Sequence, residues 1–299
     1  MNSLIETFNL GKKFGKTWAV RNLNLAVPEG SVFALLGPNG AGKSTTIQMI
    51  MNLLSPDAGQ AQVFGVPSQK LGPSEYQQIG YISENQELPM PLTVKEFLSF
   101  CQGLYVQWDP GFADRLMTDF ELPPKSRIKN LSRGMKMKLS LLSSLAYRPK
   151  LIVLDEPFTG LDPLVRDDFI KGLLELSEQE GWTLFISSHD IDEVERLADW
   201  IGILDRGELR LVERTESLQS RFRRVVVTVE NGETILPHSS WLQFERSGRH
   251  CQFVVPDYQK TSMPETSGIS FEARPMTLRE IYISLARAQK TPSIEKELQ

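Results

Sequence analysis

Cysteine and histidine are both scarce in this sequence of 299 residues. The cysteines are Cys101 and Cys251, and the histidines are His189, His238 and His250. Two cysteines cannot build a disulfide framework or a four-cysteine zinc site, and three histidines argue against a structural metal cluster. The composition is typical of a protein that folds in a reducing compartment around a hydrophobic core alone.

Long hydrophobic runs are also lacking. No 18 consecutive residues are apolar, which is about the length that a membrane-spanning helix needs. The first residues, MNSLIETFNLGKK, do not contain the apolar stretch of a secretory signal. The longest apolar runs, such as Val32–Leu36 and Leu151–Leu154, have the length of strands. We therefore expect a chain that does not span a membrane but can sit on one through a partner.

The chain as a whole has no excess of positive charge. It contains 33 Lys and Arg against 37 Asp and Glu, so the formal net charge is -4, and no nucleic-acid partner is expected. This average hides one basic segment, because residues 122–150 contain eight Lys and Arg and no acid. Such a segment is either a solvated surface or a field that attracts a phosphate group or an anionic membrane surface.

Hydrophobic periodicity divides the chain into a long α/β part and a smaller second part. Residues 1–30 alternate loosely and predict short strands and hairpins. Residues 85–150 are mainly helical in spacing, and residues 151–204 alternate between strand and helix patterns. Strand–helix alternation with continuous apolar strands predicts a parallel sheet that is covered on both faces. Near residue 213 the character changes, and β-like stretches followed by one helical stretch make up the rest.

A phosphate-binding motif follows the first buried strand. Residues 37–45 read GPNGAGKST and fit the pattern G-x-x-x-x-G-K-[ST]. Glycines let backbone N–H groups approach phosphate oxygens, the lysine can reach the β- and γ-phosphates, and the serine can ligate Mg²⁺. The alternative is a glycine-rich turn with an exposed lysine, and the motif alone does not separate kinases, GTPases and ATPases. The residues expected to bind the nucleotide here are Gly37, Pro38, Asn39, Gly40, Ala41, Gly42, Lys43, Ser44 and Thr45.

Two acids end a second buried strand. Asp155 and Glu156 directly follow Leu151–Leu154, at the strand end where open α/β sheets bind ligands. We expect Asp155, together with Ser44, to hold Mg²⁺, and Glu156 to act as the general base on the attacking water. The alternative is a solvated strand end. Since Lys43 lies 112 positions before Asp155, we interpret the helical stretch between them as an inserted subdomain.

Three further motifs occur in a fixed order around these two sites. LSRGMKMKLS spans residues 131–140, between the sites, and GLDP (160–163) and SSHD (187–190) follow the acids. This order resembles the ATP-binding subunit of an ABC transporter over about residues 4–212. Kinases and GTPases lack the middle motif, so the combination is highly specific for this family.

The resemblance implies a fold and a domain organisation. The fold class is α/β: a RecA-like P-loop ATPase core with an antiparallel β subdomain and an inserted α-helical subdomain, plus a small α+β C-terminal extension. We assign residues 1–212 to the ABC-type nucleotide-binding domain, with the helical subdomain at about 85–150. Residues 213–299 form an accessory segment without a catalytic constellation, and dimer contact, regulation and mere packing all stay open as its role.

The resemblance also implies roles for single residues. The segment LSRGM matches the signature sequence, which binds the γ-phosphate of ATP held by the other subunit, here through Ser132 and Gly134. Asp162 resembles the aspartate that passes between the two sites. His189 resembles the switch histidine that contacts the γ-phosphate and the attacking water, and Phe14 the aromatic residue that stacks on adenine. For His189 and Phe14 the alternative is a purely structural role.

Three departures from the family's usual pattern concern the metal and the phosphate. Glu84 stands where the family has glutamine after the IGY strand, and Gln86 follows two residues later. A carboxylate can ligate Mg²⁺ but cannot donate a hydrogen bond when it is ionised. The signature has Arg133 where glycine is common and Met135 where glutamine is common. These changes resemble exporter-type members.

These observations predict an ATPase subunit of an ABC transporter. We expect it to bind ATP and Mg²⁺, to dimerise around ATP with a second copy or a homologous ATPase subunit, and to drive a separate transmembrane permease in the export direction. Its expected place is the cytoplasmic face of the cell membrane, as a peripheral protein. The alternative is a non-transport ABC ATPase acting on ribosomes or chromosomes, although such proteins usually have tandem cassettes or long coiled coils. A small-molecule kinase is a third possibility, which the signature disfavours.

Overall fold

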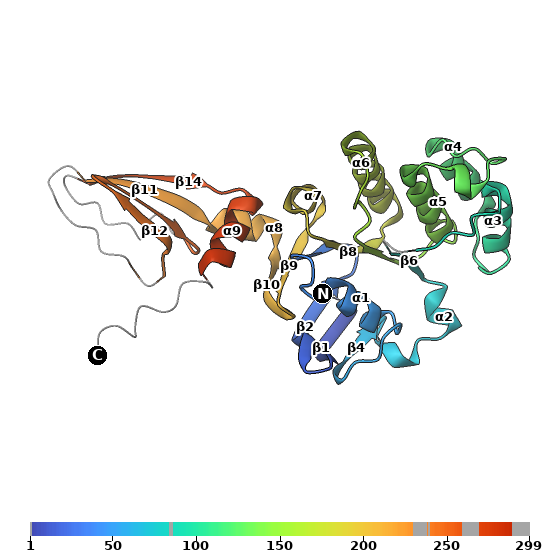
Figure 1. The fold of residues 1–299 in the computed structure, drawn as a ribbon, viewed down its shortest axis with the longest axis horizontal. Helices are drawn as coiled ribbons and strands as arrows, with labels where there is room; N and C mark the ends of the chain where they lie inside the picture. Colours follow the sequence, from blue (N-terminus) through green and yellow to red (C-terminus); the bar gives the residue numbers. More distant parts are fainter. Residues whose placement is uncertain (1, 84–85, 230–237, 239, 259–268, 289–299) are drawn as a thin grey trace. The chain divides into compact units, whose positions relative to one another are not determined.

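The computed structural model shows two compact units, Met1–Val212 and Glu213–Gln299 (Figure 1). Both units have a hydrophobic core of their own, as separate domains do. Among the described residues, no helix is long and apolar enough to cross a lipid bilayer. The residues that the structure describes are 2–83, 86–229, 238, 240–258 and 269–288.

A six-stranded sheet forms the centre of the first unit, with the strand order β10-β9-β3-β8-β7-β6 (Figure 1). From β6 through β7, β8 and β3 to β9, each neighbouring pair is parallel. Every residue of β3, β7 and β8 is buried, because a parallel sheet is covered on both faces. The bounds are β3 Val32–Leu36, β6 Ile79–Ser83, β7 Leu151–Asp155, β8 Thr183–Ser188, β9 Trp200–Asp205 and β10 Glu208–Arg214.

A second, antiparallel sheet has the order β2-β1-β4-β5. The sequence predicts only short strands in residues 1–30, whereas β1 and β2 have 12 residues each. Asn9 and Asn22 have positive φ angles of 48° and 49° and lie at register shifts of the β1–β2 pair. Such bulges shift the alternation of buried and exposed side chains without ending the strand. The hydrophobic pattern of two long strands therefore resembles that of several short ones. The bounds are β1 Ser3–Phe14, β2 Thr17–Pro28, β4 Ala58–Val63 and β5 Val66–Pro67.

The two faces of the central sheet pack into different cores. Along β7, Leu151 and Val153 join the core shared with α1 and the antiparallel sheet. Ile152 and Leu154 point the other way, into a core shared with α6 and the inserted helices. This division follows from the two-residue period of a strand. It holds the end of β7, where the two acids lie, rigidly between two packed layers.

The inserted helices α3, α4 and α5 lie between β6 and β7 in the chain, so the predicted helical insertion is confirmed. Each begins at a residue whose side chain accepts a hydrogen bond from a backbone N–H group, namely Thr93, Asp109 and Ser132, as N-caps do. The helix bounds in this unit are α1 Lys43–Ile50, α2 Pro73–Tyr76, α3 Val94–Gln102, α4 Pro110–Asp119, α5 Arg133–Leu145, α6 Pro163–Glu180 and α7 Ile191–Leu197, and the 3₁₀ turns are η1 Ser68–Lys70 and η2 Ile128–Asn130.

The second unit is a small α+β domain. Its antiparallel sheet has the order β12-β13-β11-β14. Val225 and Val227 of β11 are buried with Phe253, and the Trp241 ring stacks on Phe253 with 3.7 Å between ring centroids. The bounds are α8 Thr215–Arg221, β11 Arg223–Val229, β12 Leu242–Ser247, β13 His250–Val255, β14 Ile269–Pro275 and α9 Leu278–Ala288.

Candidate functional site

The loop between β3 and α1 can only be built with glycine at several positions. Gly42 has a φ of 106° and Gly40 a φ of 80°, a region that favours glycine. A Cβ atom at Gly42 would collide with the carbonyl oxygen of Ala19, and one at Gly37 with that of Leu204. The loop therefore runs close against its neighbours and leads directly into the N-terminus of α1. This geometry fits a phosphate group, which backbone N–H groups and a helix N-terminus bind.

Lys43 holds a buried positive charge at the centre of this loop. Its Nζ donates to the carbonyl oxygens of Gly37 at 2.7 Å and Pro38 at 3.2 Å. The same atom lies 3.0 Å from Oε1 of Glu156, and only 4% of the Lys43 side chain is exposed. The structure thus brings the lysine of the first motif against the second acid of the other motif, across 113 positions of sequence.

Asp155 accepts hydrogen bonds from two hydroxyl groups. The Ser44 hydroxyl donates to Asp155 Oδ1 at 3.0 Å, and the Ser187 hydroxyl donates to the same oxygen at 2.6 Å. Ser187 also accepts the backbone N–H of Glu156 at 3.0 Å. One hydroxyl and one carboxylate are hard oxygen donors of the kind Mg²⁺ prefers, with waters and substrate phosphates completing its shell. In the part of the chain that the structure describes, no group of three or more Asp, Glu, His or Cys side chains is placed to hold a metal ion.

Sequence reasoning missed Ser187 as a functional residue. It is the first residue of the SSHD motif and the fifth of β8, paired with Asp155 of β7 in the parallel ladder. A serine at the buried carboxyl end of the strand was the available signal, because a buried hydroxyl needs a partner.

Glu156 is held in a strained backbone conformation. Its φ is 52°, which is uncommon for a residue other than glycine, and such strain tends to gather at functional sites. His189 Nδ1 lies 2.7 Å from Glu156 Oε2, and the Thr159 hydroxyl donates to the same oxygen at 3.3 Å. The site therefore presents a fixed carboxylate between a lysine and a histidine.

The electrostatics of the site keep Glu156 charged. Burial raises the pKa of the Glu156 carboxyl, but hydrogen bonds and positive charge from Lys43 and His189 outweigh it and hold the pKa below its usual value. Glu156 is ionised at neutral pH, as a general base must be. Because an ionised carboxylate only accepts hydrogen bonds, the Nδ1 atom of His189 must be the donor in their contact.

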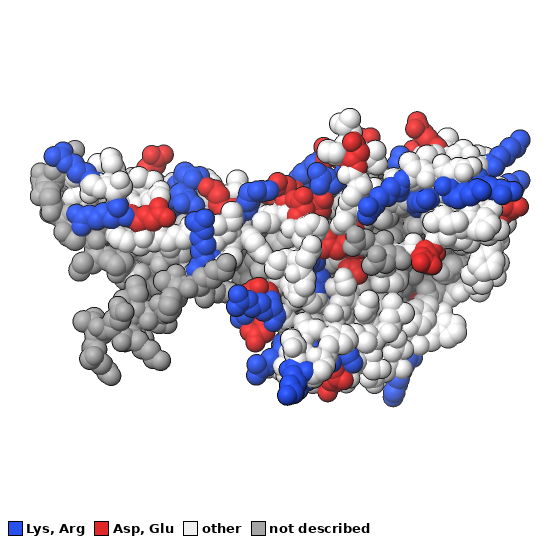
Figure 2. All heavy atoms as spheres, viewed as in Figure 1, with Lys and Arg blue, Asp and Glu red and all other residues white. Residues whose placement is uncertain are grey.

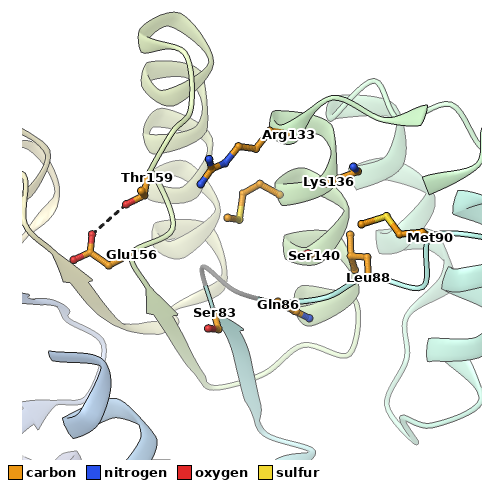
Figure 3. A pocket seen from close by; sticks show the side chains of 10 residues that line it. Ser83, Gln86, Leu88, Met90, Arg133, Lys136, Ser140, Glu156 and Thr159 are labelled. Carbon is orange, nitrogen blue, oxygen red and sulfur yellow. Dashed lines mark hydrogen bonds between the residues drawn. The ribbon is translucent and has the colours of Figure 1, made fainter. Parts of the chain in front are cut away.

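A cavity of about 130 Å³ opens beside Glu156 and Thr159. Figure 3 shows Glu156 and Thr159 on one side of it, and Arg133 reaching toward them from α5. Gln86 also lines the cavity. Glu84, the other residue predicted near the metal, lies outside the described residues.

The signature and GLDP segments meet around a second cavity of about 300 Å³. Ser132 caps α5 by accepting the Met135 N–H at 3.2 Å, and Asp162 caps α6 by accepting the Leu164 N–H at 3.0 Å. The Arg133 guanidinium packs so closely against Gly160 that a Cβ atom at that position would collide with it. The structure thus brings Ser132, Gly134 and Asp162 to one cavity, whereas Glu156 lines the other one, and Arg133 lines both.

Two other predicted features lie at the surface. The Phe14 ring at the end of β1 is 54% exposed, so it is not a core residue and is available for stacking. The basic segment 122–150 comprises η2, α5 and the connections beside them, and Lys and Arg side chains form a band over the inserted helices (Figure 2). Part of that charge is already paired, because Arg148 contacts both Asp109 and Glu180.

Comparison with known proteins agrees with this geometry. A family model described as ABC transporter matches residues 20–159. The bacitracin transport ATP-binding protein BcrA of Enterococcus faecalis is 34% identical over 226 residues, which cover 75% of this chain and 73% of that protein. The chain belongs to the ABC transporter family. Within that family it is an ATP-binding subunit that hydrolyses ATP, so this predicted activity is confirmed.

The similarity extends to the second unit and to solved ABC structures. The Nod factor export ATP-binding protein I of Rhizobium meliloti is 28% identical over 294 residues, covering 94% of this chain and 87% of that protein. A solved ATP-binding subunit of an ABC transporter superposes with a TM-score of 0.66 at 28% identity, covering 73% of this chain and 92% of that one. A dimeric ATP-binding cassette bound to ADP and phosphate gives 0.63 at 25% identity, covering 71% and 98%. The predicted ABC ATPase fold is confirmed.

Proposed function

We propose that two copies of this chain, or one copy and a homologous ATPase subunit, enclose Mg²⁺ and ATP and drive a separate membrane permease in the export direction. The observation that carries the proposal is the joining of Lys43, Glu156 and His189 in one hydrogen-bonded group beside the phosphate loop. The export direction is supported by the similarity to the Nod factor export protein. The proposed place of the assembly is the cytoplasmic face of the membrane, with this chain peripheral.

In the proposed mechanism the loop and Lys43 hold the β- and γ-phosphates. Ser44 and Asp155 would hold Mg²⁺, which supplies positive charge to the phosphate oxygens when it is bound. Glu156 accepts a proton from the attacking water, since its carboxylate is ionised and fixed. His189 orients that carboxylate through Nδ1, and its Nε2 is left to face the phosphate. Phe14 stacks on the adenine ring.

The second half of each site would come from the other subunit. Ser132 and Gly134 at the N-terminus of α5, together with Asp162, line a cavity that has neither Lys43 nor Glu156 in its wall. A helix N-terminus attracts anions, and two-fold symmetry places the cavity of each subunit against the loop of its partner. We assign this role to residues 1–212, with the helical subdomain at about 85–150, and an accessory role to residues 213–299.

The permease partner can be tested by co-expression with a membrane protein encoded beside this chain. A tagged chain should retrieve that protein from detergent-solubilised membranes, and inside-out vesicles containing both should accumulate the transported molecule only with Mg²⁺ and ATP. Vesicles made with the Lys43→Met chain serve as the control. If the chain binds no membrane protein and stays away from membranes, the proposed coupling to a permease is wrong.

Replacing Glu84 with glutamine tests whether this residue touches the metal. If its carboxylate ligates Mg²⁺, the Glu84→Gln chain should need a higher Mg²⁺ concentration for half-maximal ATP hydrolysis, because a neutral amide oxygen binds Mg²⁺ less well. Gln86→Ala is the matched variant, because Gln86 is the polar residue two positions after Glu84. An unchanged Mg²⁺ titration for Glu84→Gln would remove Glu84 from the metal site.

A further inference from the structure

Arg166 joins two parts of the site that are far apart in the sequence. It lies one turn into α6, and its backbone N–H donates to the carbonyl oxygen of Asp162 at 2.9 Å. Its guanidinium Nη1 lies 3.0 Å from Glu193 Oε1 and 3.3 Å from Asp190 Oδ2. Both acids belong to the start of α7, directly after His189. Through its backbone in α6 and its side chain against α7, this one residue connects the helix that follows the GLDP segment with the segment that carries the histidine.

Glu193 is a buried carboxylate whose position depends on this arginine. Its side chain is 9% exposed, and its Oε2 accepts the Ser188 hydroxyl at 2.8 Å. Burial raises the pKa of Glu193, while the hydrogen bonds from Ser188 and Arg166 oppose that rise. Removing one partner from a buried, paired charge is strongly unfavourable, so Arg166 keeps Glu193 in place as an acceptor.

The residues on both sides of His189 are fixed by these acids. The Ser188 hydroxyl donates to Glu193 and also accepts the backbone N–H of Asp190 at 3.0 Å. Asp190 in turn contacts Arg166. Arg166 therefore holds the backbone on both sides of His189, through Glu193 and Ser188 before it and through Asp190 after it. The ring of His189 itself contacts Glu156.

We propose that Arg166 is a positioning residue for ATP hydrolysis: with Glu193 it fixes the loop that carries His189, and it links that loop to the end of α6 at Asp162. This inference rests on the proposed role of His189. Asp162 lines the cavity assigned to the second subunit. A shift of Asp162 when the dimer closes is therefore transmitted through Arg166 to the loop that carries His189. In the proposed site, Arg166 touches neither the nucleotide nor the attacking water.

A second ion pair between the same helices provides a matched control. Arg196 Nη1 of α7 lies 2.7 Å from Asp167 Oδ1 of α6, and the two side chains are 51% and 54% exposed. This pair joins α6 to α7 without involving residues 188–190. If Arg166 only held the helices together, Arg196→Gln would have a comparable effect on hydrolysis.

The experiment compares Arg166→Met, Arg166→Lys, Glu193→Gln and Arg196→Gln in the full chain, by kcat and KM for ATP. Arg166→Met and Glu193→Gln should lower kcat on the order of tenfold with little change in KM, which corresponds to the coupling typical of one hydrogen-bonded network. Arg166→Lys should restore part of the loss, and Arg196→Gln should leave kcat unchanged. Thermal unfolding identifies any variant that fails to fold, and the isosteric Glu193→Gln then carries the test.

The deciding arm repeats Arg166→Met in a His189→Ala chain, with single-turnover phosphate release to follow slow rates. If Arg166 acts through His189, Arg166→Met should cause no further loss of the hydrolysis rate in the His189→Ala chain. The same loss in both backgrounds, or an equal loss from Arg196→Gln, would overturn the inference. Full activity of His189→Ala alone would instead contradict the proposed role of His189, and the inference with it.

Discussion

Replacing Glu156 with glutamine should abolish steady-state ATP hydrolysis and leave a stable ATP-bound dimer. The amide keeps the size of the side chain but cannot accept the proton of the attacking water, so a loss of about 10²-fold to 10⁴-fold in kcat is expected. Binding of ATP should persist, because Lys43 and the phosphate loop are unchanged. The measurements are phosphate release at saturating ATP and sedimentation velocity with and without ATP.

A matched control for this variant is Glu178→Gln, because Glu178 is an exposed glutamate on α6. It should hydrolyse ATP at the rate of the unchanged chain and show no trapped dimer. Undiminished turnover by Glu156→Gln would show that another group activates the water. A monomeric Glu156→Gln chain at saturating ATP would contradict the proposed nucleotide-bound dimer.

Mixing two inactive chains should restore ATP hydrolysis. Lys43→Met removes the charge at the phosphate loop, and Ser132→Arg fills the cavity at the signature. Each variant alone forms dimers in which both composite sites carry a defect. A mixed dimer has one site with both defects and one intact site, so random exchange of subunits should recover up to about a quarter of the unchanged chain's activity.

The control for this mixture is a chain with both substitutions. Combined with Lys43→Met, it leaves no intact composite site, so no activity should return. Circular dichroism should first show that Ser132→Arg keeps its helices, since losing this N-cap costs about 1 kcal/mol. If the two single variants stay inactive together although they exchange subunits, each site is not shared between two chains in the way proposed.

The phosphate loop and the acids were predictable because their chemistry is local in the sequence. The glycines around Lys43 and the helix that follows them are enough to make an anion site. Asp155 ends an apolar run whose length is that of a buried strand. The α/β class follows from the same runs, since continuous apolar strands alternating with helices require a sheet covered on both faces.

The links between motifs were not predictable, because they depend on which strands become neighbours. Ser187 reaches Asp155 only since β8 pairs with β7, and Arg166 reaches Glu193 only since α6 lies against α7. The left-handed backbone of Glu156 has no sequence signal either, as glutamate rarely adopts it. In the antiparallel sheet, bulges at Asn9 and Asn22 make the hydrophobic alternation irregular, so the sequence does not show that the two strands are long.

Hydrolysis by a water that Glu156 activates is tested most directly by following the γ-phosphate in water enriched in oxygen-18. The unchanged chain with Mg²⁺ and ATP should release one inorganic phosphate for each ADP, with one oxygen derived from water, and Glu156→Gln should release almost none. Formation of ADP without inorganic phosphate, together with a phosphorylated protein or small molecule, would contradict hydrolysis by a water that Glu156 activates.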